Sequence, residues 1–307
     1  MRVHIPVLLQ EVVEVLAPAP GKIFVDATVG LGGHARELLA RLDGGLLIGI
    51  DQDPEALARA EVVLGEVGGR FILKRANFAD LEDVVRPLVP EGVDGILFDL
   101  GVSSLQLDEA ERGFTYRADA PLDMRMDPTG AVTAADLVNT LSEDELARIL
   151  REYGEEPFAR RIARFLVEAR ARSPIATTGE LVEIVKAAIP ARYRRRGGHP
   201  ARRTFQALRI AVNDELGRLE TALEQAIRLL RPGGRLAVIS FHSLEDRRVK
   251  EAFRRAVYGP ETSVPHSGAS HSTYRLLLRK PLTPTSEEVA RNPRARSAKL
   301  RALERVT

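Results

Sequence analysis

The chain has 307 residues, 44% of them hydrophobic and 29% charged, which is the composition of a globular protein and excludes wholesale disorder. No apolar run approaches the roughly 18 residues that span a bilayer, and no signal-peptide cleavage site follows the short apolar start. We therefore expect a cytoplasmic protein without a membrane partner. The absence of cysteine excludes disulfides, thiolate nucleophiles and thiolate zinc sites.

The first hundred residues alternate strand and helix signals with short loops between them, which is typical of a parallel α/β sheet. Each strand signal is a short run of branched and aromatic residues, and each helix signal repeats with a period near 3.6 residues. We expect strands at 22–28, 46–51, 70–75 and 93–100, and helices at 33–42, 54–64 and 79–88.

Beyond residue 101 the alternation stops. Residues 108–130 have a loop-like composition, and the stretches 134–153, 156–172 and 178–189 have helical periodicity with no strand signal between them. We interpret 105–205 as an inserted all-helical domain and 1–104 with 206–307 as one discontinuous α/β domain. In the second part we expect one long helix at 204–230, a strand at 235–241, a helix at 244–257 and final strands at 273–279 and 298–306.

A glycine-rich loop follows the first predicted strand. Gly30, Gly32 and Ala35 match a G-x-G-x-x-A fingerprint, and Asp51 ends the second predicted strand. Such glycines let the backbone turn tightly and approach a ligand closely. Because enzymes that use NAD, FAD or S-adenosylmethionine all contain such a loop, the fingerprint alone does not identify the ligand.

Acidic residues near this loop favour one class of ligand. Asp26 would repel a pyrophosphate but suits an ammonium and a sulfonium group, Asp51 can bind two ribose hydroxyls, and Asp99 ends the fourth predicted strand. The alternative interpretation of the three carboxylates is helix capping or ordinary polarity at strand ends. Phe78, after the third strand, is a candidate for contact with an adenine or for the core.

The charge is unevenly distributed along the chain. The net charge is +2, but residues 184–307 contain 26 basic and 11 acidic side chains. Within 184–213 there are eight basic residues and no acid; among them are Arg194, Arg195, Arg196, Arg202 and Arg203. Such a run is either a solvated face or a surface for phosphates, and we favour a nucleic-acid surface because no acid compensates it.

Several long motifs together resemble one family. They are HIPVLL at 4–9, the loop at 26–34, DGILFDLGVSSLQLD at 94–108, RGFTYRADAPLDMRMD at 112–127 and YGEEPFARRIAR at 153–164, followed by HPARRTFQALRIAVNDEL at 199–216, PGGRLAVISFHSLEDRRVK at 232–250 and NPRARSAKL at 292–300. The chain resembles the MraW/RsmH family of ribosomal RNA cytosine-N(4) methyltransferases over nearly its whole length, with the stretch 258–274 left unmatched.

The resemblance implies a class I (Rossmann-like) methyltransferase sheet, mostly parallel with an antiparallel C-terminal pair, and a helical insert that recognises substrate. It implies S-adenosylmethionine as methyl donor and, as acceptor, a cytosine in the decoding region (P site) of 16S rRNA in the small (30S) ribosomal subunit. Added to Asp26 and Gly30, the donor contacts that it implies are Gly32, Gly33, His34, Asp51, Phe78, Asp99 and Gln106.

The acceptor chemistry needs positioning more than a strong base, because the lone pair of a cytosine amine is delocalised into the ring. Asp99 can accept from the amine, although no Pro-Pro-aromatic motif follows it as in DNA amino-methyltransferases. Candidates for stacking on the base, or alternatively for the core, are Phe241, Phe114 and Tyr116. His242 is a candidate proton acceptor or an oriented structural histidine.

Other chemistries lack residues. His266 and His271 have no third ligand nearby, so we expect no metal. Neither a serine nucleophile elbow nor a phosphate-binding-loop lysine is present. Two alternatives remain: an NAD-dependent oxidoreductase, which the glycine loop permits but Asp26 disfavours, and an RNA-binding ribosome assembly factor with a vestigial cofactor pocket.

Overall fold

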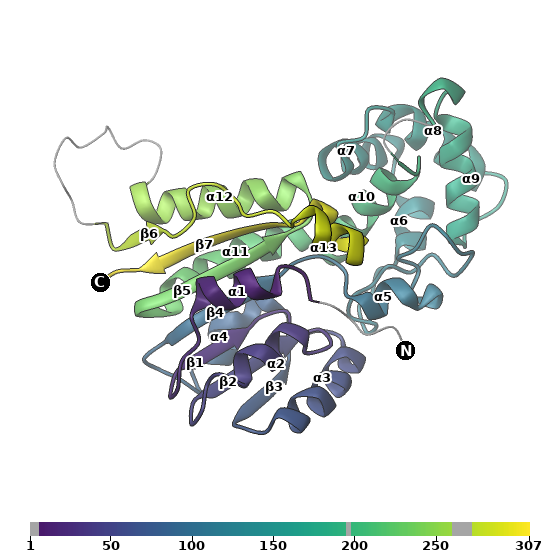
Figure 1. The fold of residues 1–307 in the computed structure, drawn as a ribbon. Helices are drawn as coiled ribbons and strands as arrows, with labels where there is room; N and C mark the ends of the chain where they lie inside the picture. Colours follow the sequence, from purple (N-terminus) through teal and green to yellow (C-terminus); the bar gives the residue numbers. More distant parts are fainter. Residues whose placement is uncertain (1–5, 195–197, 260–271) are drawn as a thin grey trace. The chain divides into compact units, whose positions relative to one another are not determined.

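The structure is a computed structural model that describes residues 6–194, 198–259 and 272–307 (Figure 1). The chain divides into two compact units. The first unit consists of Met1–Gly101 and Leu216–Thr307, and the second of Val102–Glu215. We call them the sheet unit and the helical unit, and each is described by itself.

One seven-stranded sheet forms the centre of the sheet unit, with the strand order β3-β2-β1-β4-β5-β7-β6. The first five of these strands run parallel, whereas β7 pairs antiparallel with both β5 and β6. The strands are β1 Ile23–Asp26, β2 Leu46–Asp51, β3 Phe71–Arg75, β4 Val93–Asp99, β5 Leu230–Ser240, β6 Tyr274–Leu276 and β7 Lys299–Arg305. The predicted fold class, a mostly parallel sheet with an antiparallel C-terminal pair, is confirmed.

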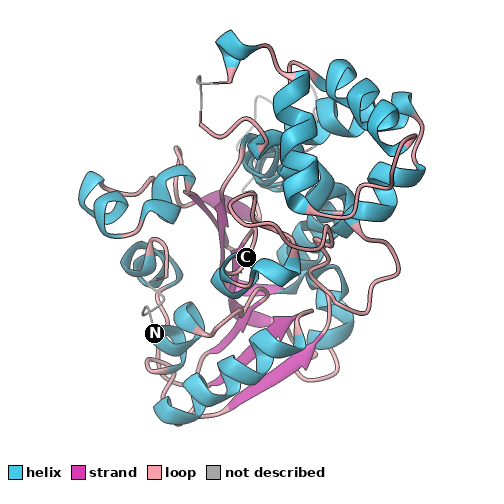
Figure 2. Ribbon diagram, turned by 90° about the vertical axis from the view of Figure 1, so that its right-hand side faces the viewer, coloured by secondary structure: helices cyan, strands magenta, loops and turns pink. Residues whose placement is uncertain are grey.

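Helices cover both faces of this sheet (Figure 2). Apolar residues of α1, α2 and α3 share one core with one face, and those of α4, α11 and α12 share a second core with the other face. The helices of the unit are α1 Leu9–Leu16, α2 Gly33–Leu39, α3 Pro54–Val67, α4 Leu81–Val85, α11 Glu215–Leu229, α12 Ser243–Tyr258 and α13 Ser286–Arg291, with 3-10 turns η1 Phe78–Asp80 and η4 Pro293–Ser297.

The central strands are apolar on both faces because both faces are covered, as is usual for parallel sheets. Tight packing also explains Gly95 in β4. A Cβ added there would lie 2.2 Å from the ring of Phe24 in β1, a distance that real side chains do not show. The sheet therefore holds the carboxyl ends of β1, β2 and β4 in a fixed register beside one another.

In the helical unit the described residues form helices and turns around a separate apolar core that includes Met124, Leu150, Leu166, Leu181 and Leu208. Helices α6, α7 and α9 begin at capping boxes on Thr133, Ser142 and Thr177, which satisfy otherwise free backbone N–H groups. The elements are α5 Ser104–Asp108, η2 Ala110–Arg112, α6 Ala134–Thr140, α7 Glu143–Gly154, α8 Ala159–Arg170, α9 Thr178–Ala188, η3 Ala191–Tyr193 and α10 Arg202–Asn213.

Three predicted helices were wrong in extent. The helix expected at 79–88 is the short helix α4, preceded by the 3-10 turn η1. The single helix expected at 204–230 is two helices, α10 and α11, because Asp214 adopts a left-handed conformation (φ 48°) that ends α10. The helix expected at 134–153 is divided where Ser142 caps α7.

Within residues 6–194, 198–259 and 272–307, no helix combines the length and apolar character needed to cross a membrane.

Candidate functional site

The glycine loop joins β1 to α2 and is built from residues in the left-handed region. Gly30 has φ 49° and Gly32 has φ 82°, conformations in which a side chain would be strained. Gly32 also packs closely on α3, since a Cβ there would lie 3.4 Å from Cα of Ala60. Gly33 then begins α2. The loop therefore presents backbone atoms at the carboxyl end of β1.

Three carboxylates lie around this loop, at the ends of adjacent strands. Asp26 ends β1, Asp51 ends β2 and Asp99 ends β4. Asp51 holds the loop directly: its Oδ2 accepts from the backbone N–H of Gly30 at 2.9 Å, and its Oδ1 accepts from that of Asp53 at 2.9 Å. The structure thus brings together the three acids that the sequence analysis singled out.

Burial dominates the electrostatics of these carboxylates. Desolvation raises the pKa of Asp26 to about 7, that of Asp51 to about 6 and that of Asp99 to about 7. The negative charges of Asp51 and Asp99 also contribute to the raised pKa of Asp26. A cationic ligand would supply the counter-charge that the protein itself does not fully provide there.

The donor set fits S-adenosylmethionine, the methyl donor that the resemblance implies. The Oδ1 atom of Asp99 is buried and has no hydrogen-bond partner among the described residues, which is unusual for a buried polar atom. Asp51 uses two of its lone pairs on backbone N–H groups and retains others for hydroxyl donors. An ammonium or sulfonium near Asp26 and Asp99 and a ribose near Asp51 would match these acceptors.

Phe78 lies in the 3-10 turn η1 after β3 and is half-buried. Its ring contacts Phe98 edge-to-face, with ring centroids 6.0 Å apart. One edge of Phe78 therefore belongs to the core while the side chain retains exposed surface. Its assignment to the adenine stays a prediction.

His34 is buried in the first turn of α2 and joins the carboxylate cluster. Its Nε2 lies 2.9 Å from the carbonyl oxygen of Val7, and its Nδ1 lies 3.5 Å from Oδ2 of Asp99. Burial lowers the pKa of His34, so the imidazole is neutral near pH 7. Its position is suited to orienting Asp99.

Gln106, the remaining predicted donor contact, belongs to the helical unit. It is buried in α5, where its Oε1 accepts from the backbone N–H of Ser103 and its own N–H donates to Ser103 Oγ in a capping box. Its side chain therefore has a local structural role, and its contact with the donor stays a prediction.

His242 and Phe241 follow β5, which is the neighbour of β4. His242 caps α12: its Nδ1 accepts from the backbone N–H of Glu245, and its Nε2 lies 3.0 Å from Oε1 of the same residue. This arrangement suits the oriented structural histidine better than a free base. Phe241 is half-buried, and a Cβ on Gly101 would lie 3.6 Å from its ring.

The two other stacking candidates lie in the helical unit. Phe114 is 6% exposed and belongs to the core of that unit, so its ring is already packed. Tyr116 stacks on His199 with centroids 4.4 Å apart and contacts Phe205 edge-to-face. His199 therefore already covers one face of the Tyr116 ring, and stacking of Tyr116 on a base stays a prediction.

The predicted basic run is described in part, because Arg195 and Arg196 lie outside the described residues. Arg194 is exposed and donates through Nε to the carbonyl of Ile189. Arg202 and Arg203 are exposed in the first turn of α10, and Arg203 donates to the carbonyl of Glu155. Cations at the N-terminal end of a helix oppose the helix dipole, so helix stability does not explain Arg202.

The sequence analysis missed two groups that shape the site. Glu245 is buried, and its Oε2 accepts from the backbone N–H groups of Phe241 and His242; its charge also raises the pKa of Asp99. Thr28 Oγ1 accepts from the backbone N–H of Asp99 at 2.6 Å. The His242-x-x-Glu245 spacing, a capping-box pattern, was the available signal for Glu245.

Comparison with known proteins assigns the family. The model of the MraW methylase family matches residues 1–306. The chain is 57% identical over 309 residues to "Ribosomal RNA small subunit methyltransferase H" of Heliobacterium modesticaldum, covering 99% of this chain and 98% of that protein. It is also 57% identical to the protein of the same name from Symbiobacterium thermophilum, over 98% of this chain and 96% of that protein.

Among solved structures, an rRNA methylase from Streptococcus thermophilus aligns with a TM-score of 0.46 at 13% identity, covering 99% of this chain and all of the other. The family match and the two near full-length relatives decide the assignment. The chain belongs to the MraW methylase family, as the motifs predicted, and S-adenosylmethionine is its methyl donor.

Proposed function

We propose that this chain methylates the exocyclic N4 amine of a cytosine in the decoding region (P site) of 16S rRNA in the small ribosomal subunit. Membership of a methylase family supports methyl transfer. The names of the relatives, at 57% identity over nearly the whole chain, support ribosomal RNA of the small subunit as substrate. The motifs quoted above support the cytosine amine.

The observation that carries the proposal is the pair of side chains at the ends of β4 and β5. Asp99 offers a buried oxygen without a hydrogen-bond partner among the described residues, and Phe241 packs near Gly101, two residues further along the chain. DNA amino-methyltransferases place an acceptor and an aromatic ring in one short motif. Here Phe241, from the next strand, supplies the ring that the segment after Asp99 lacks.

S-adenosylmethionine supplies an electrophilic methyl group on a sulfonium. The acceptor amine is a weak nucleophile until its nitrogen pyramidalises, so the protein must hold it in line with that methyl. A hydrogen bond from the amine to Asp99 Oδ1 would favour this geometry and relieve the positive charge that develops on nitrogen. Asp99 can then take the amine proton, since its pKa is raised to about 7.

We further propose that the helical unit recognises the RNA. Arg202 and Arg203 lie exposed in the first turn of α10, where a cation opposes the helix dipole. Phosphates would compensate their charge and that of the exposed Arg194. Arg195 and Arg196, on the same run of sequence, belong to this proposal by sequence alone.

The test is methyl transfer onto small ribosomal subunits from a strain that lacks this protein. Tritiated S-adenosylmethionine reports incorporation, and nucleoside analysis of the digested RNA identifies the modified base. We expect N4-methylcytidine at one position, and much slower incorporation with Asp99→Ala at unchanged RNA affinity. Methylation of another base, or equal losses of RNA affinity and turnover in the variant, would contradict the proposal.

The two alternatives give different results in the same experiment. An assembly factor with a vestigial pocket would bind the subunits without incorporating methyl groups. An oxidoreductase would bind NAD in a calorimetric titration, where we expect binding of S-adenosylmethionine only. The repulsion between Asp26 and a pyrophosphate is the physical reason for that expectation.

A further inference from the structure

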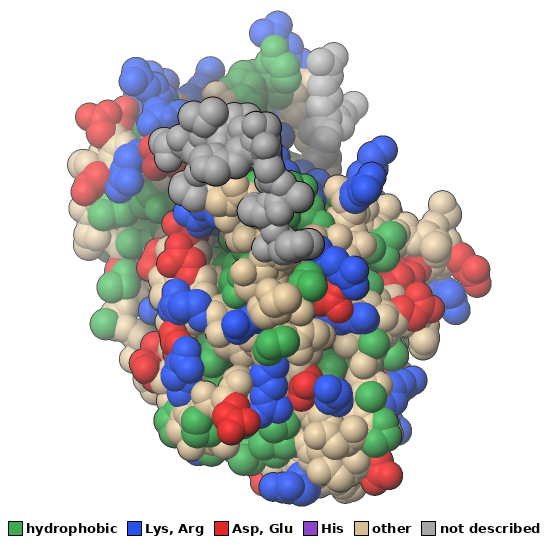
Figure 3. Space-filling model, turned by 90° about the vertical axis from the view of Figure 1, so that its left-hand side faces the viewer, with side chains coloured by type: hydrophobic (Ala, Val, Ile, Leu, Met, Phe, Trp, Pro, Cys, Tyr) green, Lys and Arg blue, Asp and Glu red, His purple; other side chains and the backbone are tan. Residues whose placement is uncertain are grey.

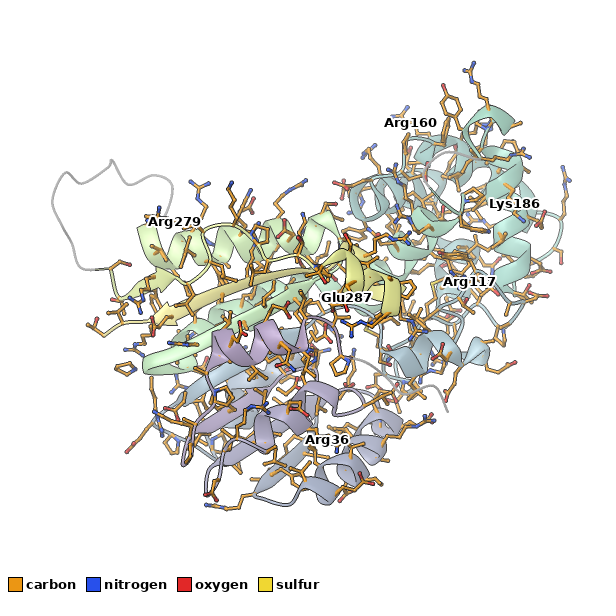
Figure 4. The ribbon with its side chains drawn as sticks, in the orientation of Figure 1. Arg36, Arg117, Arg160, Lys186, Arg279 and Glu287 are labelled. Carbon is orange, nitrogen blue, oxygen red and sulfur yellow. The ribbon has the colours of Figure 1, made fainter. Side chains whose placement is uncertain are left out.

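A surface hollow of about 340 Å³ lies in the helical unit, where α7 ends and α8 begins. The hollow is open rather than enclosed, and Phe158 forms part of its wall. Three exposed arginines line it, namely Arg151, Arg160 and Arg161. Figure 4 labels Arg160 at the start of α8, with its side chain pointing outward.

The arginines of the hollow are only weakly compensated. Among the residues that the structure describes, Arg160 makes no ion pair, and Arg151 approaches one acid, the neighbouring Glu152, at 3.7 Å. Elsewhere the protein pairs such charges: the lower part of Figure 3 shows a face of the sheet unit on which Lys and Arg lie interspersed with Asp and Glu. The hollow therefore keeps a positive charge.

One acid lines the hollow, but it does not neutralise the arginines. Glu156 is buried, and its Oε1 accepts from the backbone N–H of Phe158 at 3.0 Å. Its own burial raises the pKa of Glu156, which disfavours its charged form. Among the lining residues, three arginines therefore face at most one negative charge, and Glu152 beside Arg151 is the one further acid described above.

An aromatic platform adjoins the hollow through Phe158. The ring of Phe158 contacts that of Tyr193 with centroids 5.2 Å apart, and the guanidinium of Arg192 lies over the ring of Tyr193 at 4.9 Å. Tyr193 is 37% exposed and Arg192 is exposed. An arginine plane stacked on an aromatic ring leaves its outer face for a nucleobase.

From these observations we infer that the hollow and its platform form a subsite for one single-stranded nucleotide. Arg151 and Arg160 bind its phosphate, and the Arg192–Tyr193 stack receives its base. The inference rests on the proposed function, in that it identifies which part of the helical unit contacts the RNA. It adds a contact at the α7–α8 junction, next to the basic run, whose Arg203 donates to the carbonyl of Glu155 between the two helices.

The combination of groups favours single-stranded RNA over an acidic peptide or a duplex. A carboxylate-rich peptide would use the arginines but has no flat group for the stack. In a duplex the bases are already stacked on one another, so the platform would remain unused. A splayed nucleotide uses both parts at once.

The experiment measures binding of a fluorescein-labelled single-stranded oligoribonucleotide by anisotropy at several salt concentrations. Arg160→Ala should flatten the slope of log affinity against log salt by roughly 0.7, the value for one phosphate contact with a single strand. The matched control is Arg172→Ala, an exposed arginine just beyond the other end of α8, which should leave the slope unchanged.

The platform is tested separately from the charge. Tyr193→Leu should weaken binding at least about fivefold without changing the salt slope, because stacking on a base is worth roughly 1 kcal/mol or more. Tyr193→Phe, which keeps the ring, should bind as the parent does. Thermal denaturation of each variant checks that it is folded, and the exposure of these side chains makes that the expected result.

The inference is overturned if Arg160→Ala and Arg172→Ala change the slope equally, if Tyr193→Leu binds as tightly as the parent, or if an acidic peptide competes as well as the RNA. Its failure differs from failure of the proposed function. If the parent protein methylates subunits but all variants bind RNA normally, the subsite is disproved and the proposed function stands. If the parent transfers no methyl group but the variants show the expected effects on binding, the proposed reaction is disproved and the subsite stands.

Discussion

The Nδ1 atom of His34 lies 3.5 Å from Oδ2 of Asp99, while Nε2 of the same ring lies 2.9 Å from the carbonyl oxygen of Val7. A carbonyl can only accept, so Nε2 carries the proton and Nδ1 presents a lone pair to Asp99. A protonated Asp99 can donate to that lone pair, whereas an ionised Asp99 cannot. His34 therefore helps to hold a proton on Asp99 when no cation is present.

Binding of S-adenosylmethionine should depend on pH because of these protons. Asp26, Asp51 and Asp99 have pKa values raised to about 7, 6 and 7, and a cationic ligand favours their ionised forms. Affinity should therefore rise as pH increases from about 5.5 to 7, by up to about tenfold per pH unit for each proton released. Calorimetry in buffers of different ionisation enthalpy measures that release; affinity independent of pH would contradict it.

The same carboxylates affect the stability of the unliganded protein in the opposite sense. An acid whose pKa in the folded state exceeds its unfolded value of 3.8 retains its proton up to a higher pH in the folded state than in the unfolded state. Each such group stabilises the fold relatively more at low pH, and that contribution is lost as pH rises from about 4 to 7. The thermal shift produced by saturating S-adenosylmethionine should therefore be larger at pH 7 than at pH 5.5.

Glu245→Gln should move the pH dependence of methyl transfer. Asp99 accepts a proton only when ionised, so the rate should rise with pH across the pKa of Asp99, which is about 7 without ligand and lower beside the bound cationic donor. The charge of Glu245 raises the pKa of Asp99, and glutamine removes the charge while retaining an oxygen for the backbone N–H groups of Phe241 and His242. The midpoint of the single-turnover pH profile should shift to lower pH. An unchanged midpoint would show that the charge of Glu245 does not affect the pKa of Asp99 during methyl transfer.

Asp51→Ala should weaken binding of S-adenosylmethionine about ten- to hundredfold, through the loss of charge-assisted hydrogen bonds worth roughly 1.5–3 kcal/mol. The control is Asp94→Asn, which removes a carboxylate near the start of β4, where it binds Lys22 and the backbone of Ile23. Calorimetric affinity should be normal in the control. Equal affinities of the Asp51 variant and the parent for S-adenosylmethionine would show that Asp51 does not bind the donor.

Arg202→Ala should have opposite effects on RNA binding and on stability. If Arg202 contacts a phosphate, the slope of log affinity against log salt should flatten by roughly 0.7. The fold should be unchanged or slightly more stable, by up to about 1 kcal/mol, because a cation leaves the first turn of α10. Filter binding and thermal denaturation measure the two effects, and loss of stability without a change of slope would make Arg202 structural.

Asp214→Gly should stabilise the protein, whereas Asp214→Ala should destabilise it. The residue ends α10 in the left-handed region at φ 48°, where glycine is unstrained and alanine pays roughly 1 kcal/mol or more. Its side chain is exposed, so packing does not interfere with the comparison. The difference between the two variants in chemical denaturation is the measurement, and similar stabilities would contradict the assigned conformation.

The sheet was predictable because its signals are local. The strand at 46–51 has the bounds of β2, and a buried parallel strand is a short apolar run whatever lies beside it. The break between α10 and α11 was not predictable in the same way. Residues 204–230 keep an apolar period across Asp214, and only the tertiary structure shows that Asn213 bonds to the backbone of Met124 and Met126 beside it.

The candidate site was predictable in its acids but not in their surroundings. Asp26, Asp51 and Asp99 end adjacent strands, and strand ends can be read from sequence. The partners of these acids are distant in sequence: Val7 fixes His34, and Glu245 acts on Asp99. Such contacts depend on strand order, which periodicity does not reveal.

The pairing of β4 with β5 has a consequence for how the chain folds during synthesis. These strands are neighbours in the sheet, yet the whole helical unit separates them along the chain. The helical unit is continuous in sequence and can fold as soon as it leaves the ribosome. The edge of β4 that pairs with β5 stays unpaired until residues 230–240 have been synthesised and have emerged. A stalled or truncated chain that ends before β5 would expose that edge to other chains, which makes incomplete products prone to aggregation.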